Sequence, residues 1–233
     1  MIEARGLTKR FDGHGLALED VNFTVGPGEI YCLLGSVGSG KTTAISLFWS
    51  GERPTRGQVL VGAIDATLRP MAAKRMMTVI ASTRWLHPTL TVRGNVEFFV
   101  RMAGSRSQAL RRSVEHAMRQ MGVRERDFDR PLHQCGRDIW PLVWLSVACA
   151  RDTPAVLIDD PTTGLSPRAA DAVHDALLQL RDLGKAVLVA TSDVALATTV
   201  ADRVSLLKAG RQVAERSRAQ LLGQSLVQFH IDY

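Results

Sequence analysis

One octapeptide constrains the fold of this chain more than any other feature. Residues 35–42 read GSVGSGKT and satisfy the pattern G-x-x-x-x-G-K-[ST]. They follow EIYCLL at 29–34, an apolar run typical of a strand buried on both faces, and they precede the helical run AISLFWSG at 44–51. A strand, a glycine-rich turn and a helix in this order predict a loop whose backbone N–H groups wrap around phosphate oxygens.

We expect each part of this loop to have its own role. The glycines let successive N–H groups turn inward, and the helix that starts near Lys41 adds its positive dipole end. Lys41 itself would reach the terminal phosphates, and the Thr42 hydroxyl is a candidate ligand of Mg²⁺. The loop residues expected to bind the ligand are Gly35, Ser36, Gly38, Ser39, Gly40, Lys41, Thr42 and Thr43.

A carboxylate at the end of a second buried strand is the usual complement of such a loop. The run VLID at 156–159 places Asp159 at a strand end, where it would hold Mg²⁺ through water. Asp160 follows, at a point where a carboxylate could polarise an attacking water. Asp160 could equally be a supporting or helix-capping acid ahead of Pro161.

The order of the remaining apolar runs favours an α/β fold. AVLIDD at 155–160 and AVLVAT at 186–191 are further buried strands, and a helical pattern over 168–183 joins them. Strand, helix and parallel strand form the repeating unit of a doubly wound sheet.

Two regions depart from this repeating unit. Residues 6–25 alternate apolar and polar side chains around a turn at 12–15, which predicts an antiparallel strand pair. Residues 92–150 show only helical periodicity, which predicts a helical lobe inserted into the sheet domain.

Composition excludes several classes of protein. The longest uncharged apolar run, at 141–150, is well short of the roughly 20 residues that a membrane span requires. The start MIEARGLTKR lacks the apolar core of a signal peptide, so we expect a soluble cytosolic protein. Cys32, Cys135 and Cys149 are too widely spaced for a zinc knuckle, and we expect reduced thiols.

The basic excess of the chain is concentrated in one segment. The net charge is +6, and residues 101–130 hold eight arginines against four acids, with Phe128 as the single aromatic residue. A nucleic-acid reader more often interleaves basic and aromatic side chains. We therefore favour a solvated helical face over a nucleic-acid or lipid-headgroup surface.

The chain resembles the ATP-binding subunit of ABC transporters from residue 1 to about 222, and several further segments carry this resemblance. In order, they are IEARGLTKRF, LEDVNFTVGPGEIYCLLG, GERPTRGQVLV, LHPTLTVRGNVEFF and AVLIDDPTTGLSP. Within the family, TVRGNVEFFVRMAG is most similar to subunits of ABC-2-type exporters. The resemblance implies one domain with a P-loop NTPase core and a mainly parallel sheet. It also implies an N-terminal antiparallel β subdomain, a helical subdomain at about 92–150, and a short C-terminal tail at 223–233.

The resemblance also implies cofactors and partners. ATP and Mg²⁺ would be bound between two ATP-binding subunits, and a separate transmembrane permease subunit would complete the complex. The chain would then lie in the cytoplasm, peripherally on the inner face of the plasma membrane. Phe11 would be the aromatic platform for adenine, although it could instead be a core residue beneath the antiparallel strands.

Five positions depart from the catalytic pattern of this family. Ser82 stands where a glutamine senses Mg²⁺ and the attacking water, and Asp160 stands where a glutamate is expected. Ser192 replaces a histidine after the strand AVLVAT, and Ser166 replaces an aspartate after Gly-Leu. The segment LHQCGRDIW at 132–140 stands where the signature LSGGQ is expected.

The altered signature segment leads to a specific structural expectation. Pro141 would open a helix, and Asp138 would cap the free amides of that helix. A carboxylate there would repel the phosphate of a paired subunit. We expect Trp140 and Trp144 to be packing side chains rather than a cofactor platform.

These observations predict an ATP-binding subunit of an export complex, with slow or partner-dependent hydrolysis. Lys41, Thr42 and Asp159 would bind MgATP, and Asp160 is the candidate for a catalytic base. Because both the hydrolytic residues and the signature are altered, we favour pairing with a second, intact subunit over a homodimer. The alternatives are a nucleotide-gated structural or regulatory module and an ABC protein acting on nucleic acid or ribosomes.

Overall fold

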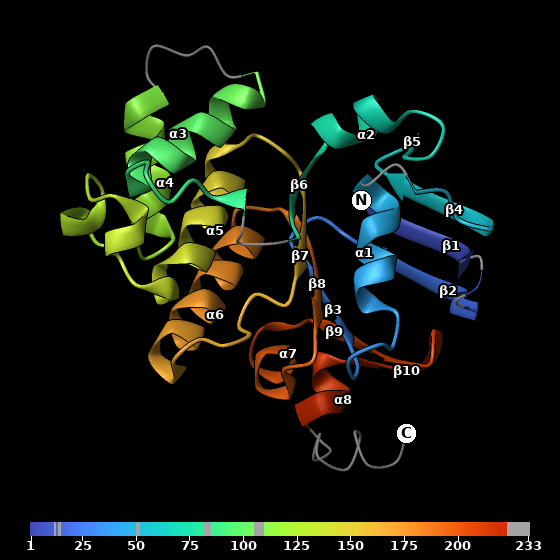
Figure 1. Ribbon diagram of the computed structural model, residues 1–233. Coiled ribbons are helices and arrows are strands. Elements are labelled where there is room, and N and C mark those ends of the chain that lie inside the picture. Colours follow the sequence, from blue (N-terminus) through green and yellow to red (C-terminus); the bar gives the residue numbers. More distant parts are fainter. Residues whose placement is uncertain (12, 14, 50–51, 82–84, 105–109, 223–233) are drawn as a thin grey trace.

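Two β-sheets and a group of helices make up the fold (Figure 1). The computed structural model describes residues 1–11, 13, 15–49, 52–81, 85–104 and 110–222. The strands are β1 (Ile2–Phe11), β2 (Gly15–Val25), β3 (Ile30–Leu34), β4 (Arg56–Val61), β5 (Ile64–Asp65), β6 (Met77–Ile80), β7 (Ala155–Asp159), β8 (Ala186–Thr191), β9 (Arg203–Lys208) and β10 (Arg211–Ser217). The α-helices are α1 (Lys41–Trp49), α2 (Pro70–Arg75), α3 (Val92–Met102), α4 (Leu110–Gln120), α5 (Trp140–Ala150), α6 (Pro167–Asp182), α7 (Val194–Val200) and α8 (Arg218–Leu222). Short 3₁₀ helices are η2 (Glu125–Asp127), η3 (Leu132–Gln134) and η4 (Arg137–Ile139).

The larger sheet has six strands in the order β10-β9-β3-β8-β7-β6. Its neighbouring strands are parallel except for β10, which runs antiparallel to β9. Every residue of β3 and β8 is buried, as their continuous apolar sequences predict for strands covered on both faces. The predicted parallel α/β core is therefore confirmed.

The smaller sheet has the order β2-β1-β4-β5. Strands β1 and β2 pair antiparallel from Ile2 opposite Val25 to Phe11 opposite Gly15, which confirms the predicted strand pair. Helix α1 fills the space between the two sheets with Ile45 and Phe48, both almost fully buried. This packing fixes the position of α1 relative to both sheets.

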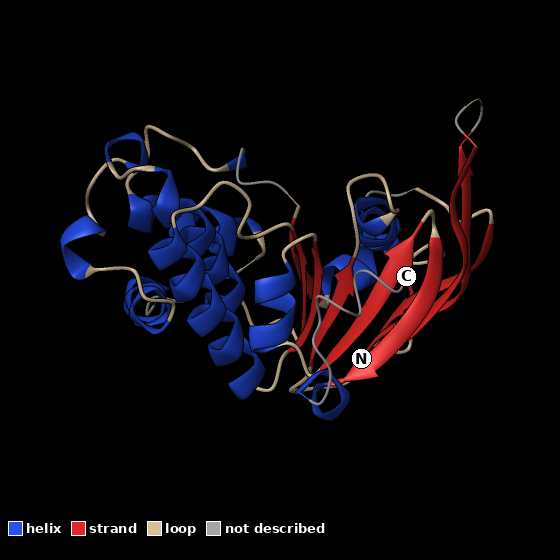
Figure 2. Ribbon diagram, turned by 90° about the horizontal axis from the view of Figure 1, so that it is seen from below, coloured by secondary structure: helices blue, strands red, loops and turns tan. Residues whose placement is uncertain are grey.

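Helices occupy the region that lacked a strand pattern. Between residues 92 and 150, the described part of the chain forms α3, α4 and α5 with short 3₁₀ turns and no named strand. Helix α5 is buried along most of its length, because eight of its eleven residues lie in the interior. Figure 2 shows most of the helices gathered on one side of the molecule and the strands on the other.

Several expectations fall partly or wholly outside the described residues. They are the turn residues 12 and 14, Ser82, and the tail predicted at 223–233. Within the described ranges, no helix is long and apolar enough to cross a membrane.

Candidate functional site

The glycine-rich loop is held between the end of β9 and the start of β2. The Gly35 N–H donates to the Thr191 carbonyl at 3.2 Å, and the Gly210 N–H donates to the Ser39 carbonyl at 2.9 Å. A side-chain carbon at Gly35 would lie 2.3 Å from the Leu207 carbonyl oxygen. The close approach of these backbones therefore excludes any larger residue at this position.

The second close approach involves Gly40, which joins the loop to the smaller sheet. Gly40 has a φ of +106°, and a side-chain carbon there would lie 2.5 Å from the Ala17 carbonyl oxygen of β2. Gly210, in the turn between β9 and β10, has a φ of +80°. A side-chain carbon there would lie 2.7 Å from the Ala17 carbonyl oxygen. Sequence reasoning missed Gly210, although its place between two strands is a turn signal.

Lys41 lies at the centre of the loop as the first residue of α1. Its side chain is almost fully buried, and its Nζ donates to the carbonyl oxygens of Gly35 and Ser36, each at 2.8 Å. Neither oxygen carries a full charge, so the ammonium has no counter-ion in these contacts. The Ser39 Oγ is also buried, without a hydrogen-bond partner among the described residues. The loop thus concentrates positive charge and unused donors, as an anion-binding loop requires.

Asp159 lies beside Thr42 at the carboxyl end of β7. The Thr42 hydroxyl donates to the Asp159 carboxylate, which brings together the two residues predicted to bind Mg²⁺. Burial raises the pKa of Asp159 above its ordinary value, and the nearby Asp160 carboxylate adds to this shift. Thr42 and the Lys41 ammonium oppose the shift without cancelling it. A cation beside Asp159 would therefore stabilise its ionised form.

Asp160 adopts a strained backbone conformation directly after β7. Its φ is +46°, and its N–H donates to the Ala190 carbonyl at 2.8 Å. Its carboxylate accepts a hydrogen bond from the Ser192 N–H at 3.1 Å. Ser166, and not Asp160, provides the N-cap of α6. The supporting role considered for Asp160 therefore corresponds to its bond with Ser192, the residue that follows β8.

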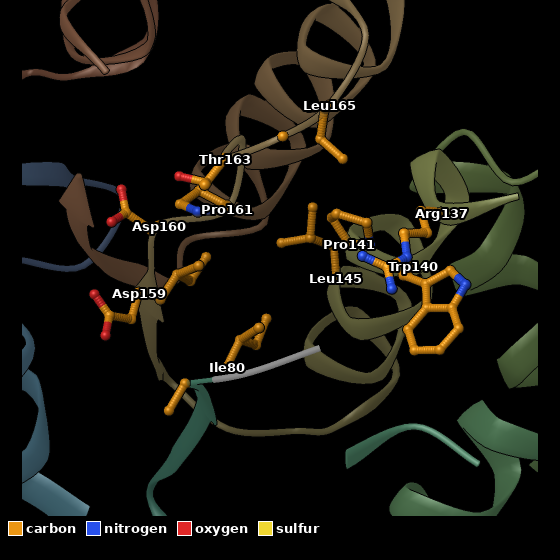
Figure 3. Close-up of a pocket in the computed structure, with 13 residues that line it drawn as sticks. Ile80, Arg137, Trp140, Pro141, Leu145, Asp159, Asp160, Pro161, Thr163 and Leu165 are labelled. Atoms are coloured by element: carbon orange, nitrogen blue, oxygen red, sulfur yellow. The ribbon is translucent and has the colours of Figure 1, made fainter. Parts of the chain in front are cut away.

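A cavity of about 580 Å³ separates Asp159 and Asp160 from the start of α5 (Figure 3). Figure 3 shows Trp140 and Arg137 on the α5 side and Ile80 at the end of β6. The carboxylates of Asp159 and Asp160 point away from the α5 side. Polar and apolar residues both line the cavity, while the two carboxylates face the opposite direction.

The expected capping of α5 by Asp138 is wrong. Asp138 lies in η4, which continues directly into α5, and the residue at the N-cap of α5, Ile139, makes no side-chain capping bond. The Asp138 carboxylate instead accepts hydrogen bonds from the Ser166 hydroxyl at 2.5 Å and from the Ser166 N–H at 3.4 Å. The N-terminus of α6 attracts this carboxylate, because the positive end of that helix dipole lies there. Asp138 therefore does not occupy the start of α5, where it was expected to repel a phosphate.

The aromatic residues divide into interior and partly exposed positions. Trp144 is buried, and its ring centroid lies 4.4 Å from that of Phe99, so it packs as expected. Trp140 lines the cavity and also packs against the main hydrophobic cluster. Phe11 belongs to neither hydrophobic cluster of the described residues, and the Lys9 Nζ lies 4.7 Å from its ring centroid. The structure therefore does not support a core role for Phe11.

The fold and this loop define a P-loop α/β domain with an added antiparallel sheet, and comparison with known proteins identifies its family. The sequence profile of the ABC transporter family matches residues 18–163. A probable anion import ATP-binding protein of Haloferax volcanii is 35% identical, over 90% of this chain and 77% of the relative. The Nod factor export ATP-binding protein I of Burkholderia lata is 30% identical, over 92% of this chain and 70% of the relative. The methionine import ATP-binding protein MetN of Symbiobacterium thermophilum is 33% identical, over 96% and 70%.

Solved structures agree with these relatives. A bacterial ABC transporter cassette in dimeric form superposes with a TM-score of 0.82 and 26% identity, over 94% of this chain and 99% of that one. The same coverage and identity hold for a cassette in a post-hydrolysis state bound to ADP and phosphate, with a TM-score of 0.81. The chain therefore belongs to the ABC transporter family, in the class of its ATP-binding subunits.

The close approach at Gly40 gives a prediction for stability. Gly38→Ala and Gly40→Ala both place a side chain at a positive φ, but only Gly40 has backbone atoms in the way. We expect Gly40→Ala to lower the free energy of unfolding by about 1–3 kcal/mol more than Gly38→Ala does. Urea denaturation of both variants and the wild type measures the difference, and equal losses would contradict the proposed packing.

The buried carboxylate gives a prediction for pH dependence. Because the pKa of Asp159 is raised by burial, the folded state binds its proton more tightly than the unfolded state does. The stability contributed by this group therefore falls as pH rises from the ordinary carboxyl range through the raised value. Asp159→Asn should raise the nucleotide-free Tm at pH 7, and the gain should shrink as pH falls below that window.

Thermal melts from pH 4 to pH 8 test this expectation against a surface control. Asp171→Asn, on the exposed side of α6, removes the same charge without a buried site and should change the Tm little. A Tm of Asp159→Asn below that of the wild type at pH 7 would show that the charge is favourable where it lies.

Proposed function

We propose that this chain binds MgATP with residues 35–43 of the phosphate loop, with Asp159 completing the magnesium site. The observation that carries the proposal is the buried Lys41 ammonium, whose contacts are two neutral carbonyl oxygens. A phosphate placed against the loop would give that ammonium an anion in direct contact. The similar cassette bound to ADP and phosphate supports this choice of ligand.

The residues at the strand end fit a magnesium ion. Thr42 and Asp159 offer a hydroxyl and a carboxylate oxygen, which are the ligand types that Mg²⁺ prefers. Mg²⁺ commonly takes one or two protein ligands, with water and phosphate oxygens completing its shell. When bound, the ion would supply positive charge to the phosphates, while Thr42 and Asp159 would orient it.

We propose that Phe11 stacks on the adenine ring. Phe11 is partly exposed at the end of β1, opposite Gly15 of β2. Strand β2 approaches the phosphate loop two residues further on, where Ala17 meets Gly40. An exposed ring at this edge can stack on a planar base with little loss of conformational entropy.

We propose that hydrolysis is slow or depends on a partner. Asp160 is the candidate base, but its side chain is one methylene shorter than a glutamate and its carboxylate already accepts the Ser192 N–H. Ser192 cannot donate a proton as a histidine can. Loss of a proton-transfer group typically reduces rate by about 10²–10⁴-fold.

The proposed assembly contains a transmembrane permease and a second ATP-binding subunit. The names of the relatives include both import and export, and we propose export on the strength of the TVRGNVEFFVRMAG segment and the Nod factor relative. A dimeric cassette among the similar structures supports pairing, and the altered signature favours a heterodimer. The chain would work in the cytoplasm, on the inner face of the plasma membrane.

We also propose that residues 1–222 form one ATP-binding domain. Its helical subdomain would span about 92–150, where α3, α4 and α5 lie, and residues 223–233 would be a tail. The relatives are transport subunits, so the alternative of a structural or regulatory module is not favoured.

Lys41→Ala tests the proposed ligand. A hydrogen bond to a charged group contributes about 1.5–3 kcal/mol, so we expect MgATP affinity to fall by about 10–100-fold. Titration calorimetry measures the change, with Lys74→Ala as a control because Lys74 is an exposed cation on α2. Equal affinities of the wild type and Lys41→Ala would exclude phosphate binding by this loop.

Turnover tests the proposed catalytic defect. We expect the purified chain to hydrolyse ATP well below the usual enzyme range of about 1–10³ s⁻¹. Asp160→Glu combined with Ser192→His should raise the rate, because it restores the longer carboxylate and a proton-carrying side chain. Steady-state phosphate release measures both proteins, and ordinary turnover by the wild type would contradict the proposal.

A further inference from the structure

One hydrogen-bonded pair joins the helices at 92–150 to the segment that follows Asp160. Asp138, in η4, precedes α5, while Ser166 is the N-cap of α6. The Ser166 hydroxyl donates to Asp138 Oδ2 at 2.5 Å, and the Ser166 N–H donates to Oδ1 at 3.4 Å. The Ala169 N–H completes the chain by donating to the Ser166 Oγ at 3.4 Å.

We propose that Asp138 and Ser166 are a positioning pair that couples the start of α5 to the segment carrying Asp160. The pair would transmit a displacement of either segment to the other. The part of the proposal that concerns nucleotide rests on the proposed function, whereas the mechanical coupling stands on the contacts alone.

The segment from Asp160 to Ser166 is held at three points. Asp160 bonds to the backbone of Ala190 and Ser192 at the end of β8, and the Thr162 hydroxyl donates to Asp193 Oδ2 at 2.8 Å. These two anchors belong to the sheet side of the molecule. The third anchor, Ser166, is the one that reaches η4 and α5. Movement of α5 relative to the sheet would therefore act on this segment through Ser166.

The cavity beside Asp159 lies between the two joined segments. One wall contains Arg137, Trp140 and Pro141, next to Asp138 in sequence, and another contains residues 158–161 and 163–165, which lead to Ser166. The Asp138–Ser166 contact therefore bridges the two walls. Leu165 on one wall and Trp140 on the other also pack against the same hydrophobic cluster, so the bond adds to an apolar contact between the two segments.

The Asp138 carboxylate favours a serine over an aspartate at 166. The resemblance leads us to expect an aspartate at 166, and such a residue would place a second carboxylate against that of Asp138. A serine supplies a hydroxyl donor instead and still caps α6. The serine at 166 is therefore compatible with the carboxylate at 138.

Hydrogen–deuterium exchange tests the pair in the full chain. Ser166→Asp keeps a good N-cap residue but opposes two carboxylates, whereas Ser166→Thr keeps both the cap and the hydroxyl. Without nucleotide, we expect Ser166→Asp to speed exchange in peptides covering 137–140 and 161–166 by about tenfold. Ser166→Thr should match the wild type, and the exchanged pair Asp138→Ser with Ser166→Asp should return to within about threefold of it.

A second variant tests the pair independently, in case Ser166→Asp does not fold. Asp138→Ala leaves the α6 cap intact and should also speed exchange in 161–166, because that segment loses its third anchor. The coupling would be overturned if residues 161–166 of Asp138→Ala exchanged at the wild-type rate. It would also be overturned if the variant with both Asp138→Ser and Ser166→Asp exchanged as fast as Ser166→Asp alone.

Addition of MgATP separates this inference from the proposed function. We expect MgATP to protect 137–140 and 161–166 together in the wild type, and to protect only 161–166 in Asp138→Ala. Equal protection of both segments in that variant would overturn the transmission of nucleotide state. If MgATP protects no segment of the wild type, the proposed function fails, while the nucleotide-free comparison still decides the mechanical coupling.

Discussion

The site depends on the close approach of three backbones around the phosphate loop. Gly35 lies against the end of β9, and Gly40 lies against β2, at distances that leave no room for a side-chain carbon. The two sheets therefore meet at this loop, and the loop's conformation is fixed before any ligand binds. A preformed anion site loses less conformational entropy on binding than a flexible one.

Two charges without full compensation make this loop more than a structural turn. The Lys41 ammonium donates to two carbonyl oxygens, and Asp159 is an acid whose ionised form is disfavoured by burial and only partly favoured by Lys41. The buried Asp159 charge costs stability in the free protein, and a magnesium-bound triphosphate would place positive charge beside Asp159 and anionic oxygens beside Lys41. Because the ligand would bring opposite charge to these groups, its binding should stabilise the folded state.

The sequence predicted those parts of the fold that follow from local patterns. The phosphate loop, the buried strands β3, β7 and β8, and the β1–β2 pair were each recognisable from periodicity and turn residues. Strands β6 and β9 were not identified, because each buries a polar residue that interrupts the apolar pattern. Thr78 in β6 is buried and shares a hydrogen bond with Thr153, and Ser205 is buried in β9.

The Asp138 prediction failed for a different reason. Capping rules consider the nearest helix in sequence, whereas the partner that Asp138 binds lies 28 residues away at the start of another helix. Likewise, the role of Gly210 beside the phosphate loop depends on how β10 returns toward β2. Tertiary contacts of this kind leave little trace in a local pattern.

The most direct test of the account is to observe the loop amides while MgATP is added. In ¹⁵N-labelled protein, the backbone amides of Gly38, Gly40 and Lys41 should show the largest chemical-shift changes, because their N–H groups would face phosphate oxygens. The account predicts that these changes saturate together with the binding heat. Saturation of the protein with MgATP while these three amides keep their free positions would contradict it.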